Sequence, residues 1–176
     1  PVIELRGQMS ATTLLLADNL KQPGRLTIQS RGEGAVPLLV IDCNEKLNLR
    51  CMAQYGEHLS SGPLVALLGK GQLQLSLETE ATRKPYQSIV PLVGESIGEI
   101  FEHYLAQSEQ LASRFFLAAS ASGIAGLFLQ KMPDADQRDV DGWTRIEALA
   151  GTVRSEELHG LSTEDLLLRL FHEETV

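Results

Sequence analysis

The chain has little cysteine and no long apolar run, and each shortage excludes a class of protein. Its only cysteines, Cys43 and Cys51, match no zinc-binding spacing. We expect both to be small core or half-exposed residues, with a disulfide or redox role as the alternative. No apolar stretch approaches the roughly 20 residues of a membrane-spanning helix, and no signal peptide is visible. The sequence therefore predicts a protein with no membrane partner.

Basic residues are also scarce, with 15 lysines and arginines against 23 acidic residues in a chain of 176. The surplus of acid is concentrated in residues 134–176, which contain 11 acidic and 4 basic side chains, whereas residues 1–133 contain 12 and 11. Nucleic-acid binding requires a basic footprint, so we expect no nucleic-acid partner. The asymmetry predicts two units, residues 1–133 and an acidic region at 134–176.

In the first unit, residues 1–133, the sequence predicts a buried helix followed by β-hairpins. Residues 3–20 predict a helix, and from Met9 to Leu16 nearly every face is apolar or small, which is typical of a buried helix. Short turns then separate runs in which apolar and polar residues alternate, and this pattern predicts antiparallel strands. The predicted strands fall near residues 25–31, 36–41, 46–55, 72–78, 86–92, 115–119 and 124–132.

A helix is predicted to begin after Ser96. The Ser96 hydroxyl and the Glu99 carboxylate have the spacing of a capping box, and apolar residues then recur with helical period as far as Leu111. The same serine lies in Gly94-Glu95-Ser96-Ile97-Gly98, which matches the G-x-S-x-G nucleophile elbow of serine hydrolases. That elbow belongs to a largely parallel sheet, whereas this chain reads as hairpins. We therefore favour the cap, and a serine hydrolase is the alternative.

The acidic region predicts a polar connector at Asp134–Asp141 and two helices, near residues 142–154 and 163–172. The connector resembles a calcium loop, but Arg138 and Asp139 occupy positions that require a ligand and a glycine. We expect it to be a solvated linker. Both helices carry one apolar face. The apolar side chains expected to lie on a sheet of the first unit are Trp143, Ile146, Leu149, Leu167, Leu170 and Phe171.

The string Tyr104-Leu105-Ala106-Gln107-Ser108-Glu109-Gln110 resembles the Tyr-x-x-x-Ser-Glu-Gln signature of the redox-regulated 33 kDa chaperonin family (heat-shock protein 33). Further matches follow the family's order and extend the resemblance from about residue 24 to the end of the chain. These segments are 69–71, 86–94, 126–133 and 168–174. We expect Tyr104, Ser108, Glu109 and Gln110 to have a structural role at the end of their helix, with direct contact to a client protein as the alternative.

Two departures from the family pattern are visible. Arg50 is followed by Cys51, where relatives resemble one another in an Arg-Gly pair. The family's C-terminal zinc domain, with its C-x-C and C-x-x-C pairs, has no counterpart in this sequence. We therefore expect a fragment with the chaperone domain and linker, and zinc only in the full-length protein. The resemblance implies an α+β fold, in which two packed, mainly antiparallel sheets surround a buried helix and a helical linker is appended.

The function that the resemblance implies is that of an ATP-independent holdase. Such a chaperone is not an enzyme, acts in the cytoplasm under heat or oxidative stress, and binds unfolding proteins so that they do not aggregate. The resemblance also implies a homodimer. We expect the linker helices to cover the client-binding surface and, without the zinc domain, to be only marginally docked. A passive dimerisation module is a further alternative.

Overall fold

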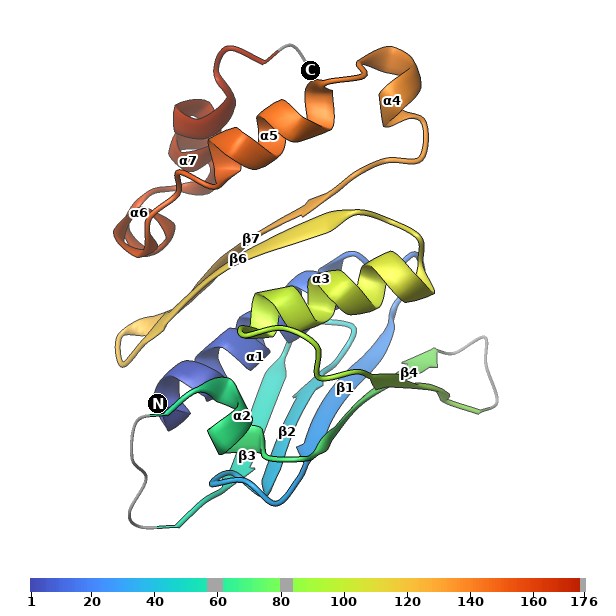
Figure 1. Ribbon diagram of the computed structural model, residues 1–176, viewed down its shortest axis with the longest axis vertical. Helices are drawn as coiled ribbons and strands as arrows, with labels where there is room; N and C mark the ends of the chain where they lie inside the picture. The colour runs from blue at the N-terminus through green and yellow to red at the C-terminus, as the bar shows by residue number, and fades with distance from the viewer. Residues whose placement is uncertain (57–61, 80–83, 175–176) are drawn as a thin grey trace.

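The protein forms four stacked layers (Figure 1). The structure is a computed structural model that describes residues 1–56, 62–79 and 84–174. From one end of the stack to the other, the layers are an antiparallel sheet, two long helices, a two-stranded hairpin and a group of short helices. No helix in the described ranges is long and apolar enough to cross a membrane.

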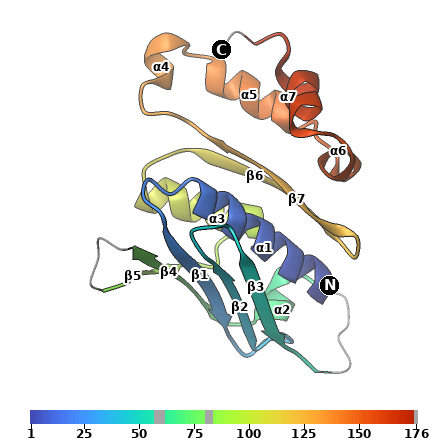
Figure 2. The ribbon, with the colours of Figure 1, turned by 180° about the vertical axis from the view of Figure 1, so that it is seen from behind.

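The large sheet has the strand order β3-β2-β1-β4-β5, and every neighbouring pair is antiparallel. Its strands are β1 (Gly24–Arg31), β2 (Leu38–Cys43), β3 (Leu49–Gln54), β4 (Gln72–Thr79) and β5 (Tyr86–Val90). The predicted alternation is confirmed in β1, where Leu26, Ile28 and Ser30 are buried while the residues between them are more exposed. One face of the sheet therefore packs on the helices, and the other faces solvent (Figure 2).

Helix α1 (Val2–Asp18) lies between the sheet and the hairpin formed by β6 (Ser113–Ser120) and β7 (Gly123–Gln130). Two of its polar residues, Thr12 and Thr13, can be fully buried because their hydroxyls are satisfied within the helix. Thr12 and Thr13 donate to the carbonyl oxygens of Gln8 and Met9 at 2.9 and 2.7 Å. The predicted burial is confirmed for residues 9–13, whereas residues 14–16 are half-buried.

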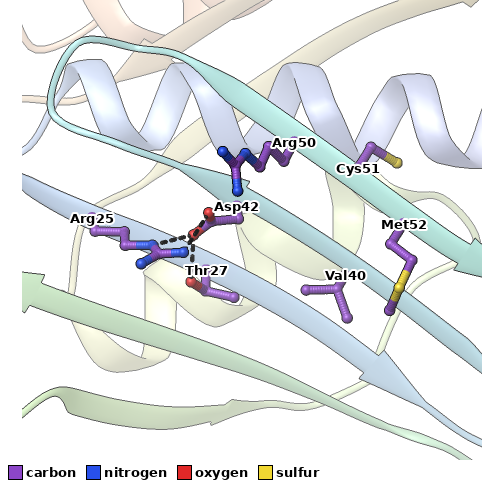
Figure 3. Close-up of a pocket in the computed structure, with 7 residues that line it drawn as sticks. All are labelled: Arg25, Thr27, Val40, Asp42, Arg50, Cys51 and Met52. Carbon is purple, nitrogen blue, oxygen red and sulfur yellow. Dashed lines mark hydrogen bonds and ion pairs between the residues drawn. The ribbon is translucent and has the colours of Figure 1, made fainter.

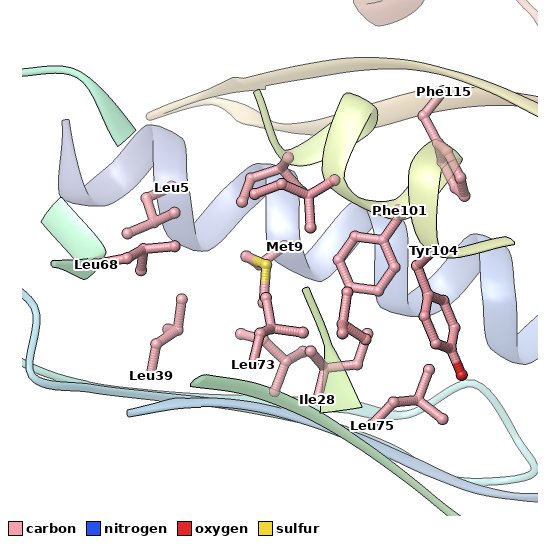
Figure 4. Packing of buried hydrophobic residues seen from close by; sticks show 14 of the residues in the cluster. Leu5, Met9, Ile28, Leu39, Leu68, Leu73, Leu75, Phe101, Tyr104 and Phe115 are labelled. Atoms are coloured by element: carbon pink, nitrogen blue, oxygen red, sulfur yellow. The ribbon is translucent and has the colours of Figure 1, made fainter. Parts of the chain in front are cut away.

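Helix α3 (Ile97–Ser108) lies in the same layer as α1, and Phe101 at its centre is fully buried (Figure 4). The Phe101 ring meets Phe115 of β6 edge-on, with 6.4 Å between ring centroids. Where α3 crosses β6, a Cβ on Gly98 would lie 3.1 Å from the Phe115 carbonyl oxygen, so a small residue permits this close approach. The core therefore joins the sheet, both long helices and the inner side of the hairpin.

Several short elements were not predicted, because elements of four to six residues are too short for a readable period. These are α2 (Leu64–Leu68), α4 (Ala135–Arg138) and α6 (Ser155–Gly160). The two predicted linker helices are present as α5 (Gly142–Ala150) and α7 (Thr163–Phe171). Helix α5 is shorter than expected, because it ends at Gly151, and Leu111 lies outside α3.

Phe101 supplies a direct test of this core. Replacing Phe101 with Ala should lower the free energy of unfolding by about 3–5 kcal/mol, because a fully buried ring is removed and a cavity remains. Urea unfolding followed by far-UV circular dichroism measures the change. Ile89→Ala on β5 is the matched control, since Ile89 is 53% exposed and its loss should cost less than about 0.5 kcal/mol. Equal effects of the two substitutions would contradict the packing described.

Candidate functional site

The hairpin β6–β7 is apolar on both faces. Phe115 and Phe128 are directly opposite each other in the antiparallel register, and their ring centroids are 4.6 Å apart. Both belong to the side that packs on α1 and α3. Because side chains alternate along a strand, the residues between them point to the opposite side. That opposite side faces the linker layer (Figure 1).

We call this second side the hairpin outer face. Its members come from neighbouring register pairs, such as Phe116 opposite Leu127 and Ala118 opposite Ala125. The hairpin outer face consists of Phe116, Ala118, Ala125, Leu127 and Leu129. All five are buried or half-buried, so another part of the chain covers them.

The cover is the part of the linker region that the structure describes, residues 134–174. Helix α6 packs on both strands of the hairpin, while α5 and α7 pack on each other. Beneath this layer Ala118 is only 4% exposed. A hollow of about 260 Å³ lies beside β6, where Gln8 of α1, Gly98 of α3 and Phe116 of the hairpin meet Val153 and Leu158 of the linker. The covering layer is therefore in contact with the hairpin through α6, and the hollow lies at the side of β6.

The six predicted linker residues have different degrees of burial. Leu170 is 3% exposed, whereas Trp143, Ile146, Leu149 and Phe171 are half-buried. The prediction for Leu167 is wrong, because this side chain is 42% exposed. Leu166, which precedes it, is the buried residue, with 8% exposed. The buried stripe of α7 therefore starts one residue earlier than predicted. Three consecutive leucines at 166–168 hide this register from the sequence.

The linker region is joined internally by ion pairs. Arg145 of α5 donates to Asp139 at 2.7 Å and to Glu174 at 2.8 Å. These hydrogen bonds hold the pKa values of both carboxyl groups below their usual range. Arg169 of α7 similarly pairs with Glu157 of α6 at 2.8 Å. Each arginine joins segments that are distant within the linker, so the linker forms a unit of its own.

One ion pair connects this unit to the hairpin. Arg114 of β6 donates through Nε to Oε1 of Glu147 in α5 and through Nη1 to Oε2 of Glu102 in α3, both at 2.7 Å. Glu102 also accepts the backbone amide of Phe115 at 2.8 Å. These hydrogen bonds raise the pKa of Arg114. The guanidinium of Arg114 thus joins the hairpin layer, to which it belongs, to the layers of α3 and α5.

Ser96 is the N-cap of α3, as predicted. Its hydroxyl accepts the Glu99 amide at 3.2 Å, and within the described residues no histidine bonds to it. The Glu99 carboxylate accepts the amide of Glu95 at 2.8 Å, not that of Ser96, so the predicted capping box is shifted by one residue. Gly94–Gly98 also follows an antiparallel strand, and this differs from the parallel sheet of a nucleophile elbow.

The family signature lies at the C-terminal end of α3. Tyr104 is 6% exposed, and burial, together with the nearby Tyr86, raises its pKa. The Ser108 hydroxyl donates to the Tyr104 carbonyl oxygen at 2.7 Å. Glu109 is the C-cap residue, and Gln110 has a left-handed φ of 56°, which turns the chain towards β6. These positions are those of a helix terminus.

Both cysteines are free, Cys43 buried and Cys51 half-buried, as predicted for small core residues. Burial raises the pKa of the Cys43 thiol, which disfavours the reactive thiolate. Within residues 1–56, 62–79 and 84–174, no three His, Cys, Asp or Glu side chains are grouped to bind a metal. The part of this chain that the structure describes therefore does not fit the zinc that the resemblance implies for the full-length protein.

A second hollow lies on the solvent-facing side of the large sheet (Figure 3). Arg25 binds both oxygens of Asp42 at 2.7 and 2.8 Å, and Thr27 donates to the same carboxylate at 3.0 Å. This hydrogen bonding lowers the pKa of Asp42. Because the arginine and the carboxylate already satisfy each other, the hairpin outer face is the stronger candidate for function.

Comparisons with known proteins agree on one family. The sequence model of the family described as "Hsp33 protein" matches residues 1–176. A 33 kDa chaperonin of Chromobacterium violaceum is 41% identical over 172 residues, which cover 97% of this chain and 58% of the relative. A 33 kDa chaperonin of Pseudomonas fluorescens is 39% identical over 184 residues, covering 100% of this chain and 60% of the relative. The chain thus spans about three fifths of the length of these curated relatives.

A solved structure shares the fold. The crystal structure of a 33 kDa chaperonin, a heat shock protein 33 homologue from Thermotoga maritima, superposes with a TM-score of 0.76 at 23% sequence identity. The match covers 98% of this chain and 63% of that one. The expected α+β architecture, with two antiparallel sheets, is confirmed by this neighbour and by the strand pairing described above.

The role of Ser96 can be tested by one substitution. Ser96→Ala should cost about 1 kcal/mol of stability, because the Glu99 amide loses its acceptor. Thermal unfolding measures this loss. Any hydrolysis of a nitrophenyl ester should be the same in the variant and the parent chain. Ester turnover that disappears with the hydroxyl would contradict the cap assignment.

The Arg145 ion pairs predict how the linker responds to acid. Carboxyl groups with lowered pKa values stabilise the folded linker above their ordinary pKa values of 3.8 and 4.5, and this contribution is lost as the pH falls through the folded values. Trp143 emission, recorded from about pH 7 to about pH 3, should therefore change less in Arg145→Gln, which lacks the pairs at every pH. Superimposable titrations would contradict this assignment.

Proposed function

Because the chain belongs to the Hsp33 family, we propose that it is the client-binding part of an ATP-independent holdase. Its partners are unfolded or partly folded proteins, which it binds so that they do not aggregate. The work is binding alone and needs no catalytic residue. The proposal divides the chain into a chaperone domain at residues 1–133 and a linker at 134–176.

The observation that supports this proposal is the covered hairpin outer face. Unfolding proteins expose apolar side chains, and a partner for them needs apolar surface of its own. A permanently exposed patch of that kind is an aggregation liability, so it has to be covered at rest. Phe116, Leu127 and Leu129 supply the apolar surface, and the linker region supplies a cover that is a separate unit.

The linker packs loosely enough to undock from the hairpin outer face, and its charge favours solubility once it has undocked. Apolar side chains of the linker such as Trp143 and Ile146 are half-buried, whereas the inner side of the hairpin packs on the fully buried Phe101. Loose packing means that less apolar area returns to water when the linker departs. The net charge of −7 over residues 134–176 then keeps the opened form soluble.

Redox control is the part of the proposal that lies outside this chain. In the full-length protein, the family resemblance implies zinc in a four-cysteine C-terminal domain, and oxidation of that domain would loosen the linker. Cys43 is a poor candidate for such a switch, because burial raises the pKa of its thiol. We further propose that the protein is a homodimer and that it acts in the cytoplasm. Both proposals rest on the family resemblance.

The proposal predicts which substitutions reduce client binding. The assay is light scattering from an aggregation-prone protein diluted from denaturant, without ATP, in the presence of this chain. Leu127→Ser should raise the amount of chain needed for half-suppression by about 3-fold or more, because an apolar contact on the hairpin outer face is lost.

The matched control is Ile89→Ser, which places the same polar group on the solvent-facing side of the large sheet, where Ile89 is 53% exposed. It should leave suppression unchanged, and circular dichroism checks that both variants are folded. A loss confined to Ile89→Ser would move the client surface to the large sheet. Absence of suppression by the parent chain, even with residues 134–176 deleted, would contradict the holdase proposal.

A further inference from the structure

Arg114 occupies an unusual position at the edge of β6. Its guanidinium contacts α3 through Glu102 and α5 through Glu147, although these two helices belong to different layers. We infer that Arg114 and Glu147 form an electrostatic latch that sets how readily the linker leaves the hairpin outer face. The latch concerns only how the linker docks on the hairpin. Its effect on client binding rests on the proposed function.

Arg114, the chaperone-domain half of the latch, is also held by a residue outside the linker, Glu102 of α3. The Glu102 side chain is only 14% exposed, and its two oxygens are divided between the Phe115 amide and the Arg114 guanidinium. Holding one branch of the planar guanidinium leaves its Nε directed at Glu147. A pre-oriented arginine loses less conformational freedom when it forms a second hydrogen bond.

The linker half of the latch lies on the helix that carries the single tryptophan. Glu147 is four residues after Trp143, so the two side chains share one face of α5. The Glu147 side chain is 26% exposed and that of Arg114 is 47% exposed, so their ion pair is partly open to water and to dissolved salt. Trp143 therefore reports on the same helix face that the latch holds.

The ion pair between Arg114 and Glu147 differs from the other ion pairs of the linker in what it joins. In the ranges that the structure describes, the other linker ion pairs join residues within 134–176 or, for Lys131 and Asp136, neighbours in the chain. Arg114–Glu147 is the one pair there that joins the linker to a distant part of the chaperone domain. Breaking it weakens the docking of the linker, while the contacts of α6 with the hairpin and the ion pairs within the linker remain.

The test is acrylamide quenching of Trp143 in Glu147→Gln, with no client present. The substitution keeps the side-chain size but removes the charge, and it leaves the Glu102–Arg114 contact in place. We expect the population of the undocked linker to rise by about 2- to 5-fold at low ionic strength, in line with a partly exposed ion pair. Glu164→Gln in α7 makes the same change of charge at an exposed residue, and should leave quenching unchanged.

Salt provides a second, independent arm. Raising the ionic strength to about 0.5 M should increase quenching in the parent chain and in Glu164→Gln, but much less in Glu147→Gln, where no pair remains to be screened. Equal quenching in Glu147→Gln and the parent chain at low salt would overturn the latch. So would an equal response of all three chains to salt.

Client suppression by the same variants separates the latch from the proposed function. Greater quenching together with stronger suppression by Glu147→Gln supports both. Greater quenching with unchanged suppression leaves the latch standing and contradicts the linker as a cover for clients. Stronger suppression without greater quenching overturns the latch, because the linker would not have moved.

Discussion

The arrangement of layers depends on the hairpin β6–β7, whose two apolar faces both need to be buried by other parts of the chain. A two-stranded hairpin is marginally stable alone in water, and β6–β7 has apolar side chains on both of its faces. It therefore needs a layer on each side. Helices α1 and α3 provide one layer through a tightly packed core. The linker provides the other through contacts of α6 with both strands, and most of its apolar side chains are only half-buried or exposed. The difference between these two interfaces is the physical basis of the proposed function.

A releasable cover requires a base that stays folded without it. The five-stranded sheet, α1 and α3 form such a base, because their shared core includes Met9, Ile28 and Phe101, all fully buried. Glu102 anchors β6 to α3 through a backbone amide, so the inner side of the hairpin has a polar attachment as well as an apolar one. Opening can thus be confined to the outer layer, in keeping with the general observation that local stability differs across a protein.

Much of the base could be predicted from local patterns. The alternation around Leu26 and Ile28, the cap at Ser96 and the mainly apolar α1 each carry a period or a spacing that one segment reveals by itself. The hairpin outer face was missed because Phe115 and Phe116 are both apolar, and such a run conceals which side each residue takes. The hairpin outer face could have been found from the unbroken apolar run around Phe115 and Phe116, because such runs are typical of strands buried on both faces.

Contacts between distant segments left no such signal. Leu166, Leu167 and Leu168 are chemically identical, so only the packing of α7 decides which one is buried. Arg114 and Glu147 are separated by 33 residues, and nothing local to either predicts the other. Individual burial and pairing in the linker are thus set by tertiary structure, although the sequence predicts an acidic helical region there.

The central claim is that clients bind where the linker lies at rest, and site-specific photo-crosslinking tests it most directly. A photoreactive phenylalanine analogue would replace Phe116 on the hairpin outer face or, in a second chain, Met52 on the solvent-facing side of the large sheet, where Met52 is 51% exposed. The account predicts client adducts from position 116, and more of them when the linker is loosened. Client adducts from position 52 alone, with position 116 reacting only within the chain, would contradict it.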